Sequence, residues 1–561
     1  MIVGGGPVGL LSASLLNKAG LTVRIVDVEF QPNHWGRGDW IHGRTLELLE
    51  RAGLETELLA TGAHVEHIQA YKNGKLVQSS PFVPDTVDSK YPYLLCVGQH
   101  ITEAMLQSQL SEHDVQVERP CTVTKIDVTA DPDFPLTLTV LNMKDSTTET
   151  VHSKYLFGCD GAHSAIRKMI NVDYVGDTTE INGGVLDALI RTNFPGKKQV
   201  SLLQNDMAKT VSLFPRENGL TRIFVHFDVN ELDLRKEQHN RNTIQLEDIQ
   251  QEAKRALMPY RLEILGTMFW STYVVGQRLA CSMQAMDSRV FLLGDAAHSQ
   301  SPTLGQGLNT GFGDVFNLVW KLAMVEKNRL SKEALLTYTM ERRPVAHQVI
   351  EIDKTVAAAA ADPTTMDTYC KVVDRHRLFT SGFGIQYPPS DDNMLLHGQT
   401  GAGMSAPNAK VIKAVSGKKA RIFDGIDVFS FSVLLLVNNL TADSLPIIRQ
   451  VIQACQEGGN GGGNSQHTRP ALMLTIVTTS TKDQLATCLD GQPDSDSLLD
   501  LIVLDKLNQN QCHRHYQNMT VSKQACMILA LIRPDGYIAT LADHPSSFTS
   551  TLQTYFDRCV L

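Results

Sequence analysis

Met1-Ile2-Val3-Gly4-Gly5-Gly6-Pro7-Val8-Gly9 is the stretch that decides the first part of the fold. A short apolar run leads into the pattern G-x-G-x-x-G, and apolar residues at helical spacing follow from Leu10 to Leu16. In such a strand–turn–helix unit the glycines let the backbone approach a pyrophosphate and let the helix pack on the strand. The pattern favours a dinucleotide site over the alternative, a glycine-rich turn that binds nothing. The residues expected to form this site are Gly4, Gly6, Pro7 and Gly9.

A second strand supports this interpretation. The run from Leu21 to Val26 is mostly apolar and ends at Asp27, where an acidic side chain can bind ribose hydroxyl groups. Glu29 is a weaker candidate for the same role. Two strands with a helix between them are typical of an α/β domain.

Another glycine-containing turn lies much later in the chain. The sequence Gly294-Asp295-Ala296-Ala297-His298-Ser299 follows the apolar run 290–293 and precedes apolar residues at helical spacing from Leu308 to Leu322. The N–H groups at the start of a helix present positive potential to electron-rich atoms. This turn can therefore hold a sugar-alcohol chain and the electron-rich edge of a flavin. The residues expected to do so are Asp295, Pro302, Gly305, Gln306, Gly307, Leu308 and Asn309.

The segment Tyr155–Ser164 has a similar form, because a strand runs into Asp160-Gly161 and a helix follows. By itself this is a common turn without a ligand. Together with the two other glycine turns, in this order along the chain, it predicts a further contact to the cofactor at Asp160.

The three turns together resemble those of the FAD-dependent aromatic hydroxylases, which are single-component flavoprotein monooxygenases, and most closely the phenol hydroxylase branch. The resemblance extends through almost the whole chain. It implies FAD as the cofactor, NADPH as the co-substrate and O2 as the oxidant. It also implies that a flavin C4a-hydroperoxide hydroxylates a phenolic or other small aromatic substrate.

Further residues match motifs of that branch. Gly36-Arg37-Gly38-Asp39 resembles its active-site loop, Gln99 its flavin-contacting glutamine, and Pro215-Arg216-Glu217 its Pro-Arg-Glu hairpin. The residues that this match assigns to the cofactor are Arg37, Gly38, Arg44 and Gln99.

Asp39 and Arg216 are the predicted catalytic residues. A phenol with a pKa near 10 is only about one-thousandth ionised at pH 7, so a base near its hydroxyl group would assist the reaction. The resemblance assigns this base to Asp39 and a cation near substrate and flavin to Arg216. The alternatives are a turn-capping carboxylate for Asp39 and a surface charge on a hairpin for Arg216.

The chain departs from the branch at Phe224, where phenol hydroxylase has a tyrosine. A hydroxyl contact is therefore missing, and we expect the substrate to differ from simple phenol. His226 lies two residues further along the same strand face and could supply a polar group, although a core or surface histidine is the more common case. Trp40 is expected to help shape an aromatic pocket, with ordinary packing as the alternative.

The order of strand-like and helical segments along the sequence divides the chain into domains. We expect a discontinuous, Rossmann-like FAD-binding domain at 1–175 and 278–375, with a sheet-rich substrate domain inserted at 176–277. A proline-rich linker is expected at 376–394. Residues 395–561 resemble the thioredoxin-like C-terminal domain of the branch without a redox cysteine pair, which favours a structural or homodimer-forming role.

Composition excludes several classes of function. The formal net charge of −9 argues against nucleic acid or an anionic membrane surface as the main partner. No run approaches the ~20 apolar residues needed to span a bilayer. The ten cysteines form no C-x-x-C pair and no convincing metal-binding spacing with histidines, so we expect no metal site. Reduced thiols, with no basic or apolar presequence, favour a cytoplasmic protein.

Three other functions stay open at this stage. The nearest is epoxidation, dearomatisation or Baeyer–Villiger oxidation of a polyketide-like substrate by the same kind of flavin enzyme. The second is a flavin reductase or oxidase that inserts no oxygen. The third is a flavin-binding regulatory protein that docks through its C-terminal domain.

Overall fold

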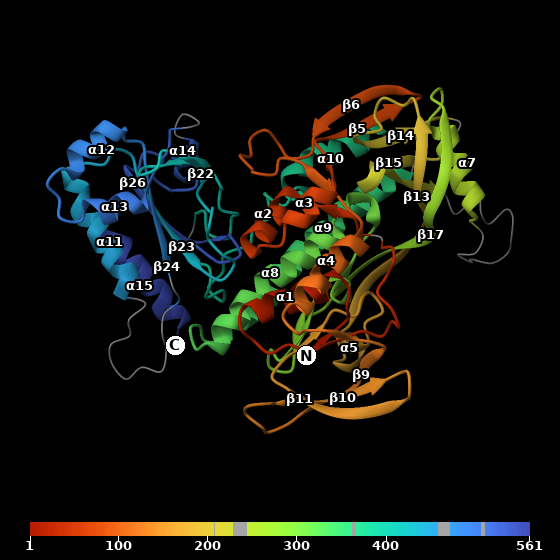
Figure 1. The fold of residues 1–561 in the computed structure, drawn as a ribbon, viewed down its shortest axis with the longest axis horizontal. Coiled ribbons are helices and arrows are strands. Elements are labelled where there is room, and N and C mark those ends of the chain that lie inside the picture. Colours follow the sequence, from red (N-terminus) through yellow and green to blue (C-terminus); the bar gives the residue numbers. More distant parts are fainter. Residues whose placement is uncertain are drawn as a thin grey trace.

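The computed structural model describes the chain except residues 37, 207, 228–243, 362–365, 399, 458–469, 471, 507–510 and 561. Within helices and strands, the side chains left out are those of 178–182, 275, 361 and 457. Figure 1 shows a C-terminal module beside a larger N-terminal body, in which the long helices α8 (Gly307–Glu326) and α9 (Thr337–Ala361) run through the centre. A large sheet lies at one end of this body and a small meander at the other.

The first sheet is built from short strands that are mostly buried and apolar. Across the sheet they are β18 (Gln284–Ala285), β19 (Val290–Leu292), β12 (Leu156–Gly158), β1 (Ile2–Val3), β2 (Ile25–Val26) and β8 (Val117–Glu118). Neighbouring strands from β19 to β8 are parallel, whereas β18 pairs antiparallel with β19. Helix α1 (Pro7–Lys18) packs against both α4 (Gln99–Ser111) and α8. This arrangement confirms the α/β first domain predicted from the sequence.

Two glycines of the first motif are required by close backbone approach. Gly4 has a φ of +110°, and a Cβ atom there would lie 2.2 Å from the carbonyl oxygen of Cys159. A Cβ atom on Gly9 would lie 1.9 Å from the carbonyl oxygen of Gly4. At Gly6, in contrast, no atom of the described residues lies within 4 Å of such a Cβ. The motif therefore packs α1 tightly on the sheet and leaves space open at the start of the helix.

The second sheet is long and strongly twisted. Across the sheet its strands are β20 (His298–Ser299), β17 (Leu262–Ala280), β13 (Tyr174–Thr192), β16 (Leu220–Phe227), β15 (Val211–Pro215), β14 (Val200–Gln204), β5 (His67–Lys72) and β6 (Lys75–Pro81). Most of these strands fall in or next to the inserted region 176–277, but β5 and β6 come from the first part of the chain. Helix α7 (Leu246–Ala256) covers one face through apolar contacts.

Smaller elements complete the N-terminal body. The remaining helices are α2 (Gly43–Ala52), α3 (Thr56–Thr61), α5 (Ala165–Met169) and α10 (Met366–Thr380). The remaining strands form a small sheet of β3 (Trp40–Ile41), β7 (Leu94–Cys96) and β4 (Ala63–Val65), and a meander of β9 (Cys121–Val128), β10 (Leu136–Asn142) and β11 (Thr147–Ser153). The short 3-10 helices of this body are η1 (Glu217–Gly219), η3 (Gly294–Ala296), η4 (Pro302–Leu304) and η5 (Lys332–Leu336), whereas η6 (Ala442–Ser444) and η7 (Pro545–Ser547) belong to the C-terminal module.

The C-terminal module has its own mixed sheet. Its strands are β22 (Lys419–Arg421), β21 (Lys410–Lys413), β25 (Ile502–Leu504), β24 (Leu472–Thr478), β23 (Phe431–Val437), β26 (Met527–Ile532) and β27 (Ile538–Ala542). Its helices are α11 (Leu445–Glu457), α12 (Lys482–Leu489), α13 (Ser495–Leu501), α14 (Gln511–Gln517) and α15 (Phe548–Cys559). Strands β23 to β25 are parallel, and β26 and β27 are antiparallel to their neighbours. The thioredoxin-like assignment of this module stays a prediction.

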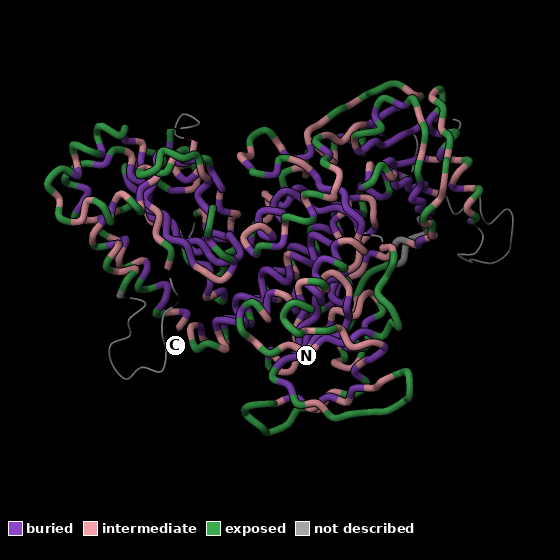
Figure 2. The backbone as a smooth tube through the Cα atoms, viewed as in Figure 1, coloured by how far each residue is buried: buried purple, intermediate pink, exposed green. Residues whose placement is uncertain are grey.

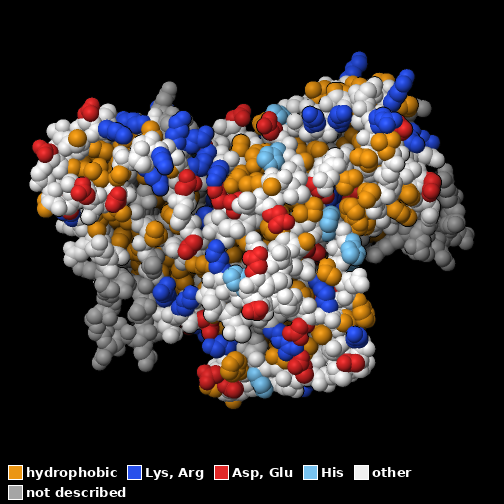
Figure 3. Space-filling model, viewed as in Figure 1, with side chains coloured by type: hydrophobic (Ala, Val, Ile, Leu, Met, Phe, Trp, Pro, Cys, Tyr) orange, Lys and Arg blue, Asp and Glu red, His pale blue; other side chains and the backbone are white. Residues whose placement is uncertain are grey.

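Burial and surface charge follow this division. Figure 2 shows buried backbone along α8 and α9 and in the centre of each module, whereas the meander is largely exposed. On the face shown in Figure 3, acidic and basic side chains are interspersed across the molecule. None of the described helices has both the length and the apolar character that crossing a bilayer requires.

Candidate active site

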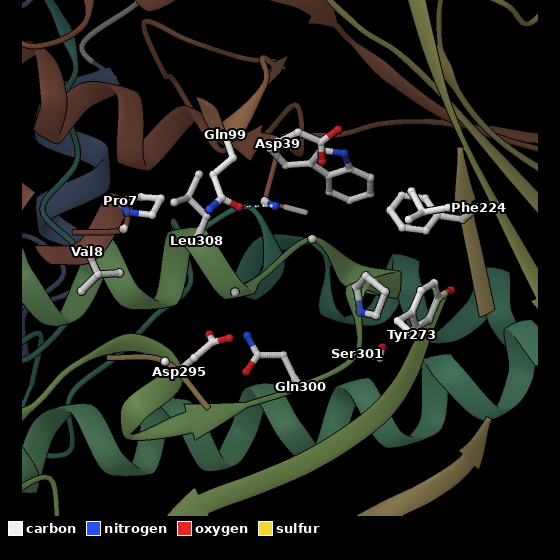
Figure 4. Close-up of a pocket in the computed structure, with 18 of the residues that line it drawn as sticks. Pro7, Val8, Asp39, Gln99, Phe224, Tyr273, Asp295, Gln300, Ser301 and Leu308 are labelled. Atoms are coloured by element: carbon white, nitrogen blue, oxygen red, sulfur yellow. Dashed lines mark hydrogen bonds between the residues drawn. The ribbon is translucent and has the colours of Figure 1, made fainter. Parts of the chain in front are cut away.

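A cavity of about 380 Å³ lies between the first and second sheets, and Figure 4 shows its walls. The three glycine turns identified in the sequence meet there. Gly6 and Pro7 line the cavity from the turn after β1, Gly161 from the turn after β12, and Asp295 from the turn after β19. They meet because β1, β12 and β19 are neighbouring parallel strands whose carboxyl ends share one edge of the sheet. The later residues of the third turn that line the cavity are Pro302, Gly305, Gly307 and Leu308.

Two carboxylates that were predicted to bind the cofactor instead form hydrogen bonds or ion pairs with other residues of the chain. Asp27 accepts a hydrogen bond from the backbone N–H of Gly5 and forms an ion pair with Arg119 at 2.7 Å. Asp160 accepts a hydrogen bond from the hydroxyl group of Ser164 at 2.5 Å and so supports the start of α5. Neither carboxylate lines the cavity.

Arg44 also lies away from the cavity. Its guanidinium donates to the carbonyl oxygen of Gly536 at 2.9 Å and to Glu47 at 3.2 Å, so it joins α2 to the C-terminal module. The structure therefore places Arg44 at an interface between modules and not among the lining residues. Arg37, also predicted to contact the cofactor, lies outside the described residues.

Gln306 and Asn309 brace the start of α8 with their side chains. Gln306 donates to the backbone oxygen of Thr380 at 3.0 Å. Asn309 donates to the backbone oxygen of Trp40 at 2.9 Å and accepts from the N–H of His42 at 2.9 Å. Their side chains hold the third turn against the loop that precedes α2.

The loop that carries Asp39 is fixed by Gln99. The N–H of Gly38 donates to Oε1 of Gln99 at 2.9 Å, and Nε2 of Gln99 donates to Glu103 one turn further along α4, at 2.8 Å. Gly38, Asp39 and Gln99 all line the cavity. In Figure 4 Asp39 and Gln99 lie on one side of it, with Asp295 and Gln300 on the opposite side. Because Glu103 accepts from the amide N–H2, the Gln99 oxygen is directed at the loop.

Asp39 belongs to a buried group that we call the charge cluster: Asp39, Asp187, Arg216, Glu217 and Arg222. All five side chains are at most 4% exposed. Asp39 Oδ2 lies 3.1 Å from Nη1 of Arg216 and 3.3 Å from Nε of Arg222. Burial raises the pKa of Asp39, while Arg222 and Arg216 act in the opposite direction. The two predicted catalytic residues are thus in direct contact.

The other walls of the cavity are largely apolar. Phe224 and Val185 face it from the second sheet, together with Tyr273, and Trp40 borders it from β3. Phe224 packs edge-on against Tyr273, with ring centroids 6.1 Å apart. His226 is not a lining residue; it is buried, and burial lowers its pKa to about 4. The structure therefore brings Phe224 and Trp40 to the cavity but not His226.

Polar atoms at the cavity fit a bound ligand. The indole N–H of Trp40 and both amide atoms of Gln300 are buried and have no hydrogen-bond partner among the described residues. Both residues line the cavity. Buried polar groups are normally hydrogen-bonded, so a ligand with polar edges would satisfy them. Together with the open space at Gly6, the Gln300 amide suits a flavin dinucleotide that lies along the glycine turns, and the Trp40 N–H is left for another polar group in the same cavity.

Comparison with known proteins decides the family. A family model described as "FAD binding domain" matches residues 1–353. The chain belongs to this family. A phenol 2-monooxygenase from Aspergillus fumigatus, fsqG, is 30% identical over 99% of this chain and 95% of its own length. A 3-hydroxybenzoate 4-monooxygenase from Comamonas testosteroni is 32% identical over 75% of this chain and 71% of its own length.

Solved structures agree with the fold. A ternary complex of aklavinone-11 hydroxylase with FAD and aklavinone superposes with a TM-score of 0.73, at 19% identity, over 100% of this chain and 98% of that chain. The flavin-dependent monooxygenase PieE, in complex with FAD and substrate, gives a TM-score of 0.69 at 16% identity, over 99% and 98%. The protein is therefore an FAD-dependent monooxygenase with a Rossmann-like FAD domain.

Sequence reasoning missed part of the site. Asp187 and Arg222 were not predicted as site residues, and neither was Gln300. The signal for Asp187 was available, because it is a single carboxylate in the otherwise apolar strand segment 184–190 and buried charges are paired or functional. Nothing local to Arg222 or Gln300 distinguishes them from surface residues, since their positions depend on the second sheet and the third turn.

Proposed function

We propose that the protein hydroxylates a phenolic aromatic substrate, with NADPH as electron donor and O2 as oxidant. The observation that carries this is the position of Asp39, a buried carboxylate in the wall of the cavity that the FAD-binding turns also line. When bound there, FAD supplies the redox chemistry and the transfer of an oxygen atom. The residues of the chain bind and orient the substrate and exclude water from the cavity. Asp39 takes up the proton of the phenolic hydroxyl group.

The role of Asp39 follows from the weak acidity of phenols. A phenol with a pKa near 10 is almost entirely un-ionised at pH 7. The difference of three units between this pKa and pH 7 corresponds to a free energy of ionisation of about 4 kcal/mol. A base beside the hydroxyl group recovers part of this in the transition state. Burial raises the pKa of Asp39, and a carboxylate with a raised pKa is a stronger base. Its proton affinity is then better matched to a phenol.

The walls of the cavity support an aromatic substrate. Phe224, Tyr273 and Val185 offer flat or branched apolar surface next to Asp39. The buried indole N–H of Trp40 can donate a hydrogen bond to a polar substituent of the substrate. Simple phenol has no such second substituent, so we expect a substituted phenol to be preferred.

The test is a panel of phenols, hydroxybenzoates and larger polyhydroxylated aromatics. The purified, FAD-loaded protein is mixed with NADPH and each compound, and NADPH oxidation and product mass are measured. A substrate that accelerates NADPH oxidation and gains one oxygen atom supports the proposal. Accelerated oxidation that yields only hydrogen peroxide across the panel contradicts it and favours a reductase or oxidase.

An Asp39→Asn variant separates hydroxylation of phenols from the alternative oxidations. We expect product formation to fall by about 10²–10⁴-fold, while FAD content and reduction by NADPH persist. Epoxidation or Baeyer–Villiger oxidation needs no phenol base. Full product formation by the variant would therefore favour one of those reactions.

A second cavity supports NADPH as the electron donor. Its volume is about 410 Å³, and it shares Tyr273, Asp295 and Gln300 with the first cavity. Lys168 and Arg278 also line it. Basic side chains beside the flavin-binding cavity suit the phosphate groups of a nicotinamide dinucleotide.

The variant Arg278→Gln tests this assignment. We expect a several-fold rise in the KM for NADPH with unchanged FAD content. Lys125→Gln, in an exposed ion pair on the meander, is the control, because Lys125 lines neither cavity. A KM for NADPH that stays at the wild-type value in Arg278→Gln would place the nucleotide elsewhere.

The C-terminal module and the oligomeric state are also proposals. We infer a thioredoxin-like module with a structural role, from the resemblance and from the mixed sheet described above. A homodimer is the expected state in solution. Light scattering of the purified protein tests it, and a mass near 62 kDa would contradict it.

A further inference from the structure

The charge cluster contains more carboxylates than guanidinium groups. Asp39, Asp187 and Glu217 share Arg216 and Arg222, and all five side chains are buried. If every group were ionised, the cluster would carry a net charge of −1 in a water-poor environment. Like charges held close together in such an environment favour retention of a proton by one carboxylate. The geometry decides which carboxylate that is.

Asp187 takes one edge of Arg222. Nε and Nη2 of Arg222 donate to the two oxygens of Asp187 at 2.8 and 2.7 Å. This two-point geometry is the strongest form of the carboxylate–guanidinium contact. The contact from Arg222 Nε to Asp39 is longer, at 3.3 Å, and uses an atom that already donates to Asp187.

Glu217 takes the corresponding edge of Arg216. Nε and Nη2 of Arg216 donate to the two oxygens of Glu217 at 3.0 and 2.8 Å. Glu217 also accepts from the N–H of Gly98 at 3.0 Å. Asp39 accepts a hydrogen bond from the remaining nitrogen of Arg216, Nη1, at 3.1 Å. The same Nη1 also donates to Asp187, at 3.4 Å. Asp39 is therefore the least compensated carboxylate of the cluster.

We propose that Asp187 and Glu217 are positioning residues for the proposed base: by holding Arg222 and Arg216 in two-point ion pairs, they make Asp39 the carboxylate that takes up and releases a proton. This inference rests on the function proposed for Asp39. The directions of titration agree with the geometry. Burial raises the pKa of Asp39, with Asp187 and Glu217 adding to the rise. The pKa of Glu217 is lowered, because its hydrogen bonds and its contact with Arg216 outweigh the effect of burial.

Among the described residues, two further titratable side chains lie beside the cluster, Cys96 of β7 and His100 near the start of α4. Burial raises the pKa of Cys96 and lowers that of His100. Both shifts favour the neutral forms near pH 7, so neither residue supplies a charge that could replace Asp187 or Glu217. The proton balance of the cluster is set by its own three carboxylates.

The first experiment compares pH profiles of kcat/KM for the FAD-loaded wild type, Asp187→Asn and Glu217→Gln, with the best substrate of the panel. Removing either carboxylate frees a guanidinium group for Asp39, which then releases its proton more easily. We expect the acidic limb of the profile to move to lower pH by about 1 unit or more. Loss of activity without movement of the limb, in variants that retain FAD, would mean that the two carboxylates are merely structural.

The second experiment needs no turnover. The infrared difference between wild type and Asp39→Asn isolates the carbonyl band of protonated Asp39, and the band is followed with pH in the FAD-loaded protein. The same difference is recorded in the Asp187→Asn and Glu217→Gln backgrounds. We expect the band to be lost at a lower pH in both. An unchanged titration would overturn the inference.

The two experiments distinguish this inference from the proposed function. If the band shifts as expected but Asp39→Asn forms product at the wild-type rate, the cluster controls Asp39 but Asp39 is not the base. Because Asp187 lies in β13 and Glu217 in η1, misfolding of one variant leaves the other as a test. His100→Gln is the control for the remaining titratable neighbour, and its acidic limb should stay at the wild-type pH.

Discussion

At the scale of single residues, environment gives the same side chain different roles. Asp27 and Asp160 accept hydrogen bonds from neighbouring groups that hold the turns in shape. Asp39 instead lines a cavity and shares two guanidinium groups with two better-paired carboxylates. The residue type is the same in all three cases, but Asp39 lies in a cavity wall where burial raises its pKa, which agrees with the proton transfer that we propose for it.

Glu103 gives a residue-scale prediction on pH dependence. Burial raises its pKa from 4.5 to about 7. Between these values the unfolded chain loses the proton while the folded protein retains it, so stability falls as the pH rises through this window. Above pH 7 both forms are ionised and the loss is complete, at about 3 kcal/mol.

We therefore expect Glu103→Gln to melt at a higher temperature than the wild type at pH 8 and at a similar temperature at pH 5. The amide can still accept a hydrogen bond from Gln99. Glu112→Gln, at the exposed end of the same helix, is the control and should follow the wild type at both pH values. A Glu103→Gln variant that gains no stability between pH 5 and pH 8 would contradict the assignment.

At the scale of elements, the turn from η3 to α8 shapes the cavity through one tight contact. Gly305 has a φ of +60°, and a Cβ atom there would lie 1.8 Å from Cε3 of Trp40. Both residues line the cavity. Asn309, at the start of α8, donates to the backbone oxygens of both Trp40 and Gly305. The turn and β3 therefore form one unit that positions the indole ring.

Gly305→Ala tests this unit. The methyl group must displace the ring of Trp40, so we expect a lower melting temperature of the apoprotein and a large loss of FAD, measured as the 450 nm to 280 nm absorbance ratio. Gly307→Ala is the matched control for stability. Its Cβ would meet nothing closer than Gln300 Nε2 at 3.5 Å, and it lies in the helix, where alanine is favoured. Equal melting temperatures of the two variants would contradict the role of the contact.

At the scale of the whole molecule, a buried ion network joins the C-terminal module to the FAD domain. Glu341 of α9 accepts from Arg533, next to β26, at 2.6 and 2.8 Å, and from Lys321 of α8 at 2.8 Å. All three side chains are fully buried. Although burial opposes ionisation of Glu341, Arg533 and Lys321 hold its pKa well below the usual range. The network is a buried link between the module and the FAD domain, in addition to the contact of Arg44 with Gly536.

Glu341→Gln should destabilise the protein strongly. Removing the charge leaves Lys321 without its buried carboxylate partner and leaves Arg533 with Asp535 alone, and breaking a buried pair in this way costs about 3–5 kcal/mol. We expect a lower melting temperature and faster proteolytic separation of the C-terminal module. Asp287→Asn is the control, because it removes one partner of an exposed ion pair with Lys332 and exposed pairs contribute little. Equal behaviour of the two variants would show that the network does not hold the modules together.

The sequence predicted the turns and strands that depend on local rules. The glycine motif at Gly4, the Asp160-Gly161 turn and the turn from Gly294 to Asn309 each follow an apolar strand and precede a helix. Such units are recognisable from spacing alone, because short-range backbone geometry requires glycine at positions such as Gly4. The meeting of these turns became clear only from the structure, in which β1, β12 and β19 are parallel neighbours with their carboxyl ends at one edge of the sheet.

The roles of individual charged side chains were decided only by the tertiary structure. Asp39 and Arg216 are 177 residues apart in sequence yet 3.1 Å apart in space, and Asp187 and Arg222 join them from separate strands of the second sheet. Arg44, expected at the cofactor, instead meets the C-terminal module. Long-range contacts set burial, pairing and hence proton affinity, and none of these is encoded in the spacing of neighbouring residues. The sequence by itself determined which turns could bind a dinucleotide, whereas the packing of two sheets determined the buried pairing of Asp39 on which its proposed role as a base rests.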